Sequence, residues 1–200
     1  MLALAAKALY LPYAARLAAL ALGYFVVAKA TLVFAIPPGY ATAVWPPSGI
    51  ALAAILFWGV RCWPGIWLGA ALTNYSIDLS MPAALGIAAG NTLEAVCAVW
   101  LVEAFLEGDT ELRRPEAVFL FALLAALASV IAATAGVTAL LVTGAMPVEQ
   151  YLANWYTWWQ GDTTGILIVT PCVLVWSRAA RSGETQIGRA SCRERVYVLV

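Results

Sequence analysis

The chain has 200 residues, of which 64% are hydrophobic and 11% are charged, and its mean hydropathy is +0.86. This composition lies outside the range of ordinary soluble domains and predicts an integral membrane protein surrounded by a lipid bilayer. The formal net charge of zero provides no basic face for a nucleic acid, and the chain has no histidine, the commonest metal ligand and general base. We therefore expect no nucleic-acid partner, no metal and no cofactor.

Six apolar stretches of about spanning length follow one another, separated by proline, glycine or charge: 13–36, 45–60, 63–77, 83–106, 116–143 and 150–177. A full span needs about 20 residues, so the second and third stretches are short and form either two steep helices or one re-entrant hairpin. Arg61 lies at their shared turn, and a guanidinium inside hydrocarbon would be costly, which favours two spans. The sequence thus predicts an all-α, polytopic transmembrane bundle over 13–177, after a cytoplasmic lead at 1–12.

The distribution of cations predicts the orientation of this bundle, because cytoplasmic loops carry the excess of Lys and Arg. With the N-terminus inside, the outer loops at 37–44, 78–82 and 144–149 hold no cation. Seven cations then lie in cytoplasmic positions: Lys7, Arg16, Arg61, Arg113, Arg114, Arg178 and Arg181. We therefore expect both the N-terminus and residue 178 onward to be cytoplasmic, with 178–186 as a connector.

The segment 187–200 differs sharply from the residues before it. Its letters IGRASCRERV resemble the conceptual translation of a common sequencing adapter, so we interpret 187–200 as a non-native tail and exclude it from functional reasoning. The alternative is a basic cytoplasmic tail.

Few ionisable groups lie within the apolar stretches, and such groups are functional candidates by default. They are Lys29, Glu94 and Asp162, with Asn74 and Asn91 as amide companions. At about 1.5 Å per helical residue, most of these groups fall in the outer half of the bundle, where they would form one outward-facing polar pocket. We predict that Lys29 pairs with Asp162 or Glu94, either to hold the bundle together or to bind a ligand.

Glycines at GxxxG spacing let helices approach closely. The spacing occurs three times, at Gly65/Gly69, Gly86/Gly90 and Gly161/Gly165. The second pair is followed at the same spacing by Glu94, so that these three residues lie at i, i+4 and i+8 on one face of the predicted helix. The glycine face of that helix therefore ends at a carboxylate. We interpret the pattern as evidence for a compact bundle and, more weakly, for a homodimer.

The letters WPPSG at 45–49 are typical of a helix start, with Trp45 at the interface and Pro46 and Pro47 in the first turn. The alternative is that Ser48 and the backbone N–H groups beside Gly49 receive an anionic group.

A dense aromatic cluster precedes the last stretch and contains Tyr151, Trp155, Tyr156, Trp158 and Trp159. An interfacial belt explains most of it, and a lid or binding platform is the functional alternative.

Four stretches in this order resemble the type-one membrane-associated sensor domain of bacteria: IPPGYATAVWPPSGIALA, WPGIWLGAALTN, AAGNTLEAVCAVWL and WYTWWQGDTTGILIVTP. The resemblance runs from about residue 11 to residue 177. It implies motif roles for Trp45, Pro46, Pro47, Ser48, Gly49, Gly90, Asn91, Glu94, Trp159, Gly161, Asp162 and Gly165. No established ligand accompanies these positions, so the partner is an unknown small ligand or membrane protein.

The same resemblance implies a module of about eight helices in the bacterial inner membrane. Such modules are joined to a histidine kinase, a diguanylate cyclase or a phosphodiesterase, as in two-component and cyclic di-GMP signalling. We therefore expect a fragment with six of the eight helices that is not itself an enzyme, any catalysis lying in a missing output domain. The alternative is a fragment of a secondary transporter, although no internal repeat is evident.

Overall fold

The computed structural model describes residues 12–35, 42–77, 79–106, 112 and 114–182, and for 178–182 it describes the backbone alone. The predicted lead at 1–12 falls almost wholly outside these residues, as does the tail at 187–200. Within them the chain is helical and contains no strand. The main helices are α2 (Tyr13–Leu32), α3 (Pro46–Trp58), α4 (Trp63–Tyr75), α5 (Met81–Phe105), α6 (Pro115–Val142) and α7 (Tyr151–Ser182). Two short 3-10 turns, η1 (Val60–Cys62) and η2 (Val148–Gln150), precede α4 and α7.

Proline marks the first turn of α3, α4, α5 and α6, where its missing N–H costs nothing. Ser80 caps α5 by accepting a hydrogen bond from the Ala83 N–H at 3.4 Å. Gly59 follows α3 with a φ of +82°, a conformation that glycine adopts without strain. The predicted all-α class is therefore confirmed.

The predicted count of about six spans, two of them short, is confirmed only in part. By length and apolar composition, three of the described helices are able to cross a membrane: α2, α5 and α6. α3 and α4 have 13 residues each, or about 20 Å, which is less than the roughly 30 Å hydrocarbon core. Arg61 is exposed at the turn between them, as expected. α7 has 32 residues and continues beyond the predicted end at 177.

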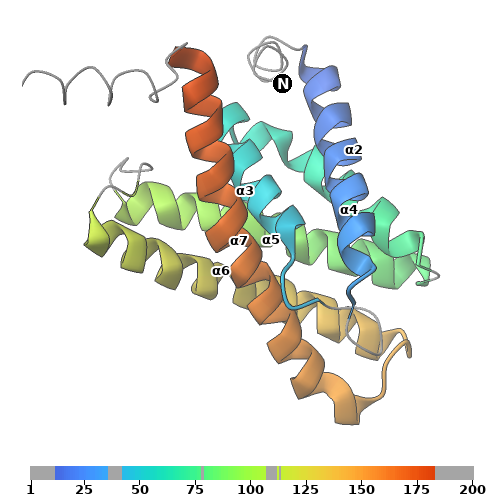
Figure 1. Ribbon diagram of the computed structural model, residues 1–200. Coiled ribbons are helices and arrows are strands. Elements are labelled where there is room, and N and C mark those ends of the chain that lie inside the picture. Colours follow the sequence, from blue (N-terminus) through green and yellow to red (C-terminus); the bar gives the residue numbers. More distant parts are fainter. Residues whose placement is uncertain (1–11, 36–41, 78, 107–111, 113, 183–200) are drawn as a thin grey trace, which may run out of the picture.

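α3 lies at the centre of the bundle (Figure 1) and packs against α2, α5 and α7. α5 and α6 form an antiparallel pair, α4 joins α2 to α5, and α7 packs along α6 and α3. Eight of the 13 residues of α3 are buried, which fits a helix that is apolar on every side. Within the WPPSG motif at its start, Pro47, Ser48 and Gly49 are buried and Trp45 and Pro46 are half-buried.

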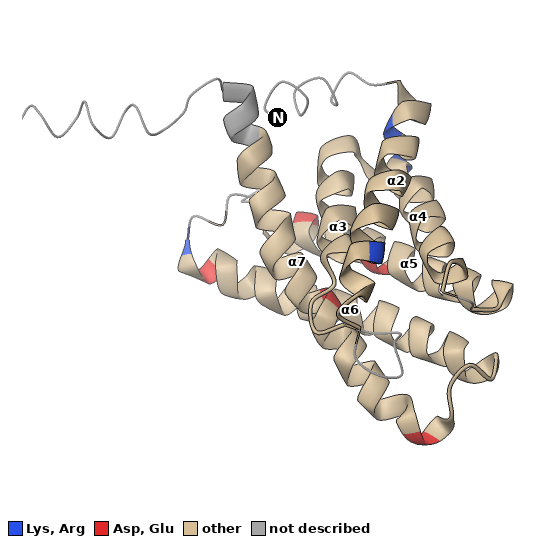
Figure 2. Ribbon diagram, turned by 45° about the vertical axis from the view of Figure 1, so that its right-hand side comes forward, with Lys and Arg blue, Asp and Glu red and all other residues tan. Residues whose placement is uncertain are grey.

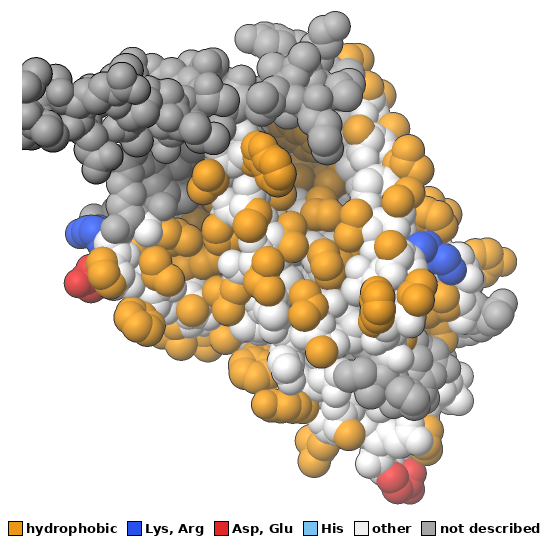
Figure 3. Space-filling model, viewed as in Figure 1, with side chains coloured by type: hydrophobic (Ala, Val, Ile, Leu, Met, Phe, Trp, Pro, Cys, Tyr) orange, Lys and Arg blue, Asp and Glu red, His pale blue; other side chains and the backbone are white. Residues whose placement is uncertain are grey.

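Charged residues gather mainly at helix ends, but acidic segments also lie within the body of the bundle (Figure 2). The face seen in Figure 3 is covered by hydrophobic side chains, with charges at its margins. Exposed large hydrophobic residues include Leu22, Val26, Leu93, Trp100, Phe119 and Leu127. An apolar surface of this extent matches a hydrocarbon environment.

Candidate functional site

The start of α3 is fixed directly to α7. The Trp45 N–H donates to the Gly161 carbonyl oxygen at 2.8 Å, and Thr170 Oγ1 donates to the Gly49 carbonyl oxygen at 3.0 Å. Pro46 and Pro47 form the first turn, as the motif predicted. These contacts hold Ser48, which is only 3% exposed, in the interior between α3 and α7.

The Ser48 hydroxyl lies between two carboxyl groups. Its Oγ is 2.7 Å from Asp162 Oδ1 on α7 and 3.1 Å from Glu94 Oε2 on α5. Glu94 is 1% exposed and Asp162 is fully buried. Three helices that are far apart in the sequence thus converge on one hydroxyl. The partners of the Ser48 hydroxyl are carboxyl groups of the chain itself, and the receipt of an external anionic group by Ser48 stays a prediction.

Each carboxyl group also has an oxygen without a hydrogen-bond partner among the described residues, namely Glu94 Oε1 and Asp162 Oδ2. Unpaired buried polar atoms are rare because each one costs free energy relative to solvation. Ser129 of α6 is fully buried beside Glu94, and its hydroxyl likewise has no partner among those residues. The centre is therefore rich in acceptor oxygens and poor in donors.

Tyr24 and Asn91 border this centre. Tyr24 of α2 is fully buried, and its hydroxyl accepts a hydrogen bond of 2.9 Å from Asn91 Nδ2. Asn91 lies one helical turn before Glu94 and is 3% exposed. Sequence reasoning identified Asn91 but missed Tyr24 and Ser129. Two sequence features could have identified them: a tyrosine hydroxyl inside an apolar span and a lone serine in an alanine-rich span.

The prediction that Lys29 pairs with Asp162 or Glu94 is wrong. Lys29 Nζ donates instead to the Ser76 carbonyl oxygen at 3.4 Å, in an exposed position. Ser76 is the C-cap of α4, and the carbonyl groups at a helix C-terminus attract a cation. Lys29 thereby avoids the interior, and the acids meet a hydroxyl rather than an ammonium group.

Asn74 also lies away from the acids. It is buried, but its Nδ2 donates to the Ala70 carbonyl oxygen in its own helix at 2.8 Å. The proposed gathering of polar groups thus includes Ser48, Asn91, Glu94 and Asp162 and excludes Lys29 and Asn74.

The glycines of α7 and α3 allow this close approach. A Cβ on Gly161 would overlap the Thr42 carbonyl oxygen, and one on Gly165 would overlap the Trp45 carbonyl oxygen. A Cβ on Gly49 would lie 2.7 Å from Val169 Cβ. Backbone therefore packs on backbone around Ser48 and Asp162.

The glycines of α5 face α6 in the same way. A Cβ on Gly86 would lie 2.9 Å from Ala139 Cβ, and one on Gly90 would lie 2.6 Å from Ala135 Cβ. The glycine face of α5 that ends at Glu94 thus packs closely against another helix, as predicted. Gly65 and Gly69 pack on α2. All three GxxxG pairs are occupied within the chain and give no support to a homodimer.

The aromatic cluster joins α7 to α6. Trp155 Nε1 donates to Thr134 Oγ1 at 3.0 Å, and Trp159 Nε1 donates to the Ala126 carbonyl oxygen at 2.8 Å. The Trp155 and Trp159 rings are stacked with centroids 6.2 Å apart. Trp158 is 7% exposed. Both indole donors are used within the chain, which favours a packing role over a binding platform.

The chemistry available at this centre is the binding of positive charge. Two carboxyl groups and the Ser48 hydroxyl converge there, with the buried Ser129 hydroxyl beside Glu94. Among the described residues, no group of three or more His, Cys, Asp or Glu side chains is arranged to hold a metal ion.

Comparison with known proteins gives one match. The model of the MASE1 family, a family of membrane-associated sensor domains, matches residues 16–194. This range begins within α2 and contains the other helices described above. It also includes part of the segment 187–200, whose interpretation as a non-native tail stays a prediction. Neither a search of curated proteins nor a search of solved structures found a match.

Proposed function

Because the chain belongs to the MASE1 family of membrane sensor domains, which occur in signalling proteins, we propose that it is the sensory input unit of a bacterial signal-transduction protein. It receives a membrane or periplasmic signal and passes it to a cytoplasmic output domain of the kinase, cyclase or phosphodiesterase type. The signal acts by changing how the helices pack around the Ser48 centre.

The observation that carries this proposal is the sharing of the Ser48 hydroxyl by Glu94 and Asp162. A switch needs an element whose two arrangements differ in their affinity for the stimulus. α3, α5 and α7 meet at a polar contact within an otherwise apolar bundle, so a change there alters the packing of all three helices. Buried ionisable groups in a membrane protein are the first place to expect such a function.

α7 provides a route from this centre to the cytoplasm. Asp162 lies in its first half, and the helix continues without interruption to Ser182. The 20 residues after Asp162 extend about 30 Å at the rise of an α-helix. A displacement at Asp162 is therefore carried along α7, which contains Pro171, towards the output domain.

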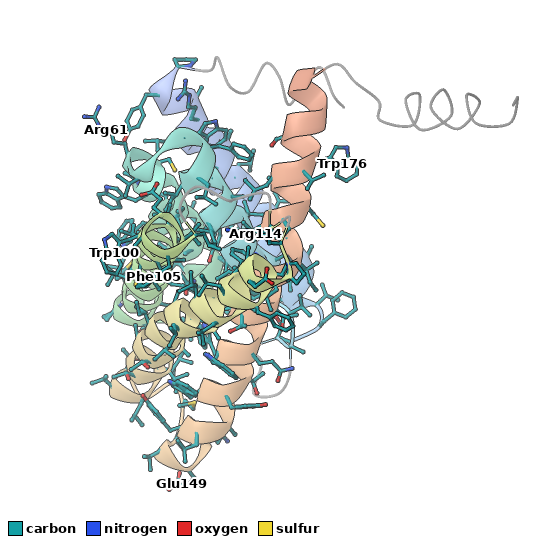
Figure 4. All side chains as sticks on the ribbon, turned by 90° about the vertical axis from the view of Figure 1, so that its left-hand side faces the viewer. Arg61, Trp100, Phe105, Arg114, Glu149 and Trp176 are labelled. Carbon is teal, nitrogen blue, oxygen red and sulfur yellow. The ribbon has the colours of Figure 1, made fainter. Side chains whose placement is uncertain are left out.

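The proposed orientation has both ends of the bundle in the cytoplasm. The start of α2 and the end of α7 lie at the same end of the molecule (Figure 1). Arg61 and Glu149 lie at opposite ends (Figure 4), in keeping with a cytoplasmic α3–α4 turn and a periplasmic α6–α7 turn. Labelling of single cysteines introduced at positions 61 and 149, with a membrane-impermeant reagent on intact cells, tests this: labelling at 149 alone is expected.

The test of function is Asp162→Asn in the full-length protein, with membrane abundance and output activity measured together. Asparagine keeps the size of the side chain and removes its charge, so normal abundance with altered output is expected. Glu149→Gln is the matched control, since Glu149 is exposed in η2 and its amide should change neither quantity. Lost abundance, or unchanged output at normal abundance, would contradict a switch at this centre.

A further inference from the structure

The contacts of Ser48 fix the number of protons at this centre. A serine hydroxyl has one proton to donate and two lone pairs that accept. Its Oγ lies within hydrogen-bond distance of both Asp162 Oδ1, at 2.7 Å, and Glu94 Oε2, at 3.1 Å. One proton cannot serve both contacts. The second contact is a hydrogen bond only when one of the two carboxyl groups is protonated and donates to Ser48.

The surroundings of the two carboxyl groups also indicate that one of the two groups is protonated. Among the described residues, the groups that face them include no cation: Tyr24 from α2, Ser48 from α3, Asn91 from α5, Ser129 from α6 and Trp158 from α7. The positive end of the α3 dipole offers about half an elementary charge. That compensates one buried carboxylate at most, and a second negative charge beside it would be strongly disfavoured.

The packing selects the smallest possible cation. Gly161 and Gly165 bring the backbone of α7 against Thr42 and Trp45, on either side of Asp162, with no room for a methyl group. Calcium and magnesium ions need about six or more oxygen ligands, and the described residues include no group of three or more His, Cys, Asp or Glu side chains arranged to hold a metal ion. A proton needs no additional space, because it lies within an existing hydrogen bond.

We propose that Glu94, Ser48 and Asp162 form a proton-binding site, and that the bound proton holds α3 against α5 and α7. Loss of the proton leaves two carboxylates competing for one hydroxyl, so one contact breaks and the helices separate there. The use of this step as a stimulus rests on the proposed sensory function. The binding of the proton does not.

The site is tested on the purified chain in lipid nanodiscs by infrared spectroscopy across a pH series. The carbonyl stretch of a neutral carboxyl group is expected at neutral pH and is lost on raising the pH. Glu94→Gln together with Asp162→Asn should abolish this band, and Asp162→Asn alone should lower the proton affinity at least tenfold because the amide can donate to Ser48. Glu103→Gln, on the exposed side of α5, is the control that keeps the wild-type band.

A second measurement separates proton binding from packing. The thermal unfolding midpoint of the wild type should fall as the pH rises, because a second buried negative charge appears. The double variant should show a smaller pH dependence, and Glu103→Gln should follow the wild type. A wild type without the neutral-carboxyl band, or a double variant that retains it, would overturn the proposal. Loss of the band on adding sodium at constant pH would also overturn it and assign the site to a metal cation.

The output of the full-length protein then distinguishes the two proposals. A pH-dependent output that the double variant loses supports the proton as stimulus. If the infrared band behaves as expected but the output does not change with pH, the proton-binding site is supported. The proposal that the proton is the stimulus is then contradicted. If the output is also unaffected by every substitution at the centre, the sensory function proposed for this centre fails as well.

Discussion

Gly165→Ala is the substitution that most directly tests the contact between α7 and the start of α3. A Cβ at this position would overlap the Trp45 carbonyl oxygen and lie 2.5 Å from the Trp45 carbonyl carbon. Ordinary van der Waals contacts begin at 3.4 Å, so the two backbones must separate by more than about 1 Å. The obstacle is main chain that cannot rotate away, and it lies three residues before Ser48.

The expected magnitude combines two opposing effects. Overpacking a tightly packed contact costs about 1–3 kcal/mol. Replacing a helical glycine with alanine returns roughly 1 kcal/mol through lower backbone entropy in the unfolded state. We therefore expect Gly165→Ala to lower the free energy of unfolding by up to about 2 kcal/mol.

Gly23→Ala is the matched control. Gly23 lies within α2, and a Cβ there would meet no atom within 4 Å. The same chemical change should therefore leave stability unchanged or raise it by up to about 1 kcal/mol. Unfolding in detergent micelles, followed by circular dichroism, measures both variants. Equal stability of the two would refute the close backbone packing at Trp45 and, with it, the geometry of the site.

Three further substitutions test individual contacts by the same unfolding assay. Ser48→Ala should cost about 1–3 kcal/mol because two carboxyl groups lose their shared partner, whereas Ser129→Ala should cost less because its hydroxyl makes no hydrogen bond among the described residues. Equal losses would contradict this assignment. Tyr24→Phe should cost about 1 kcal/mol by leaving the Asn91 amide without its acceptor, and a neutral result would dismiss that bond. Lys29→Ala should cost under about 1 kcal/mol, as expected for an exposed contact, and a loss of 3–5 kcal/mol would restore the buried ion pair.

Much of the architecture was predictable from the sequence because hydrophobic runs and helix punctuation are local properties. The prolines at 46, 47, 64, 82 and 115 mark the first turns of four helices, as expected from their missing N–H groups. The glycine strip of α5 also predicted a close neighbour beside Glu94. The second and third apolar stretches were predicted to be short, and α3 and α4 have 13 residues each.

The membership of the site was predicted in part. Ser48, Asn91, Glu94 and Asp162 were identified because polar groups in apolar spans are costly and therefore informative. The error concerned Lys29, which was paired with an acid by counting charges at similar depth. A long flexible side chain can turn towards a helix terminus, and sequence position does not reveal that choice.

The sequence by itself therefore determined the membrane class, the helices and the polar residues that the interior must accommodate. Only the tertiary structure decided which of those residues meet. The meeting depends on contacts between segments 46 and 114 residues apart in the chain, set by glycine packing and by the rotation of each helix about its axis. The local sequence pattern does not determine that rotation. The pairing of two acids through one serine hydroxyl therefore became visible only in the packed structure.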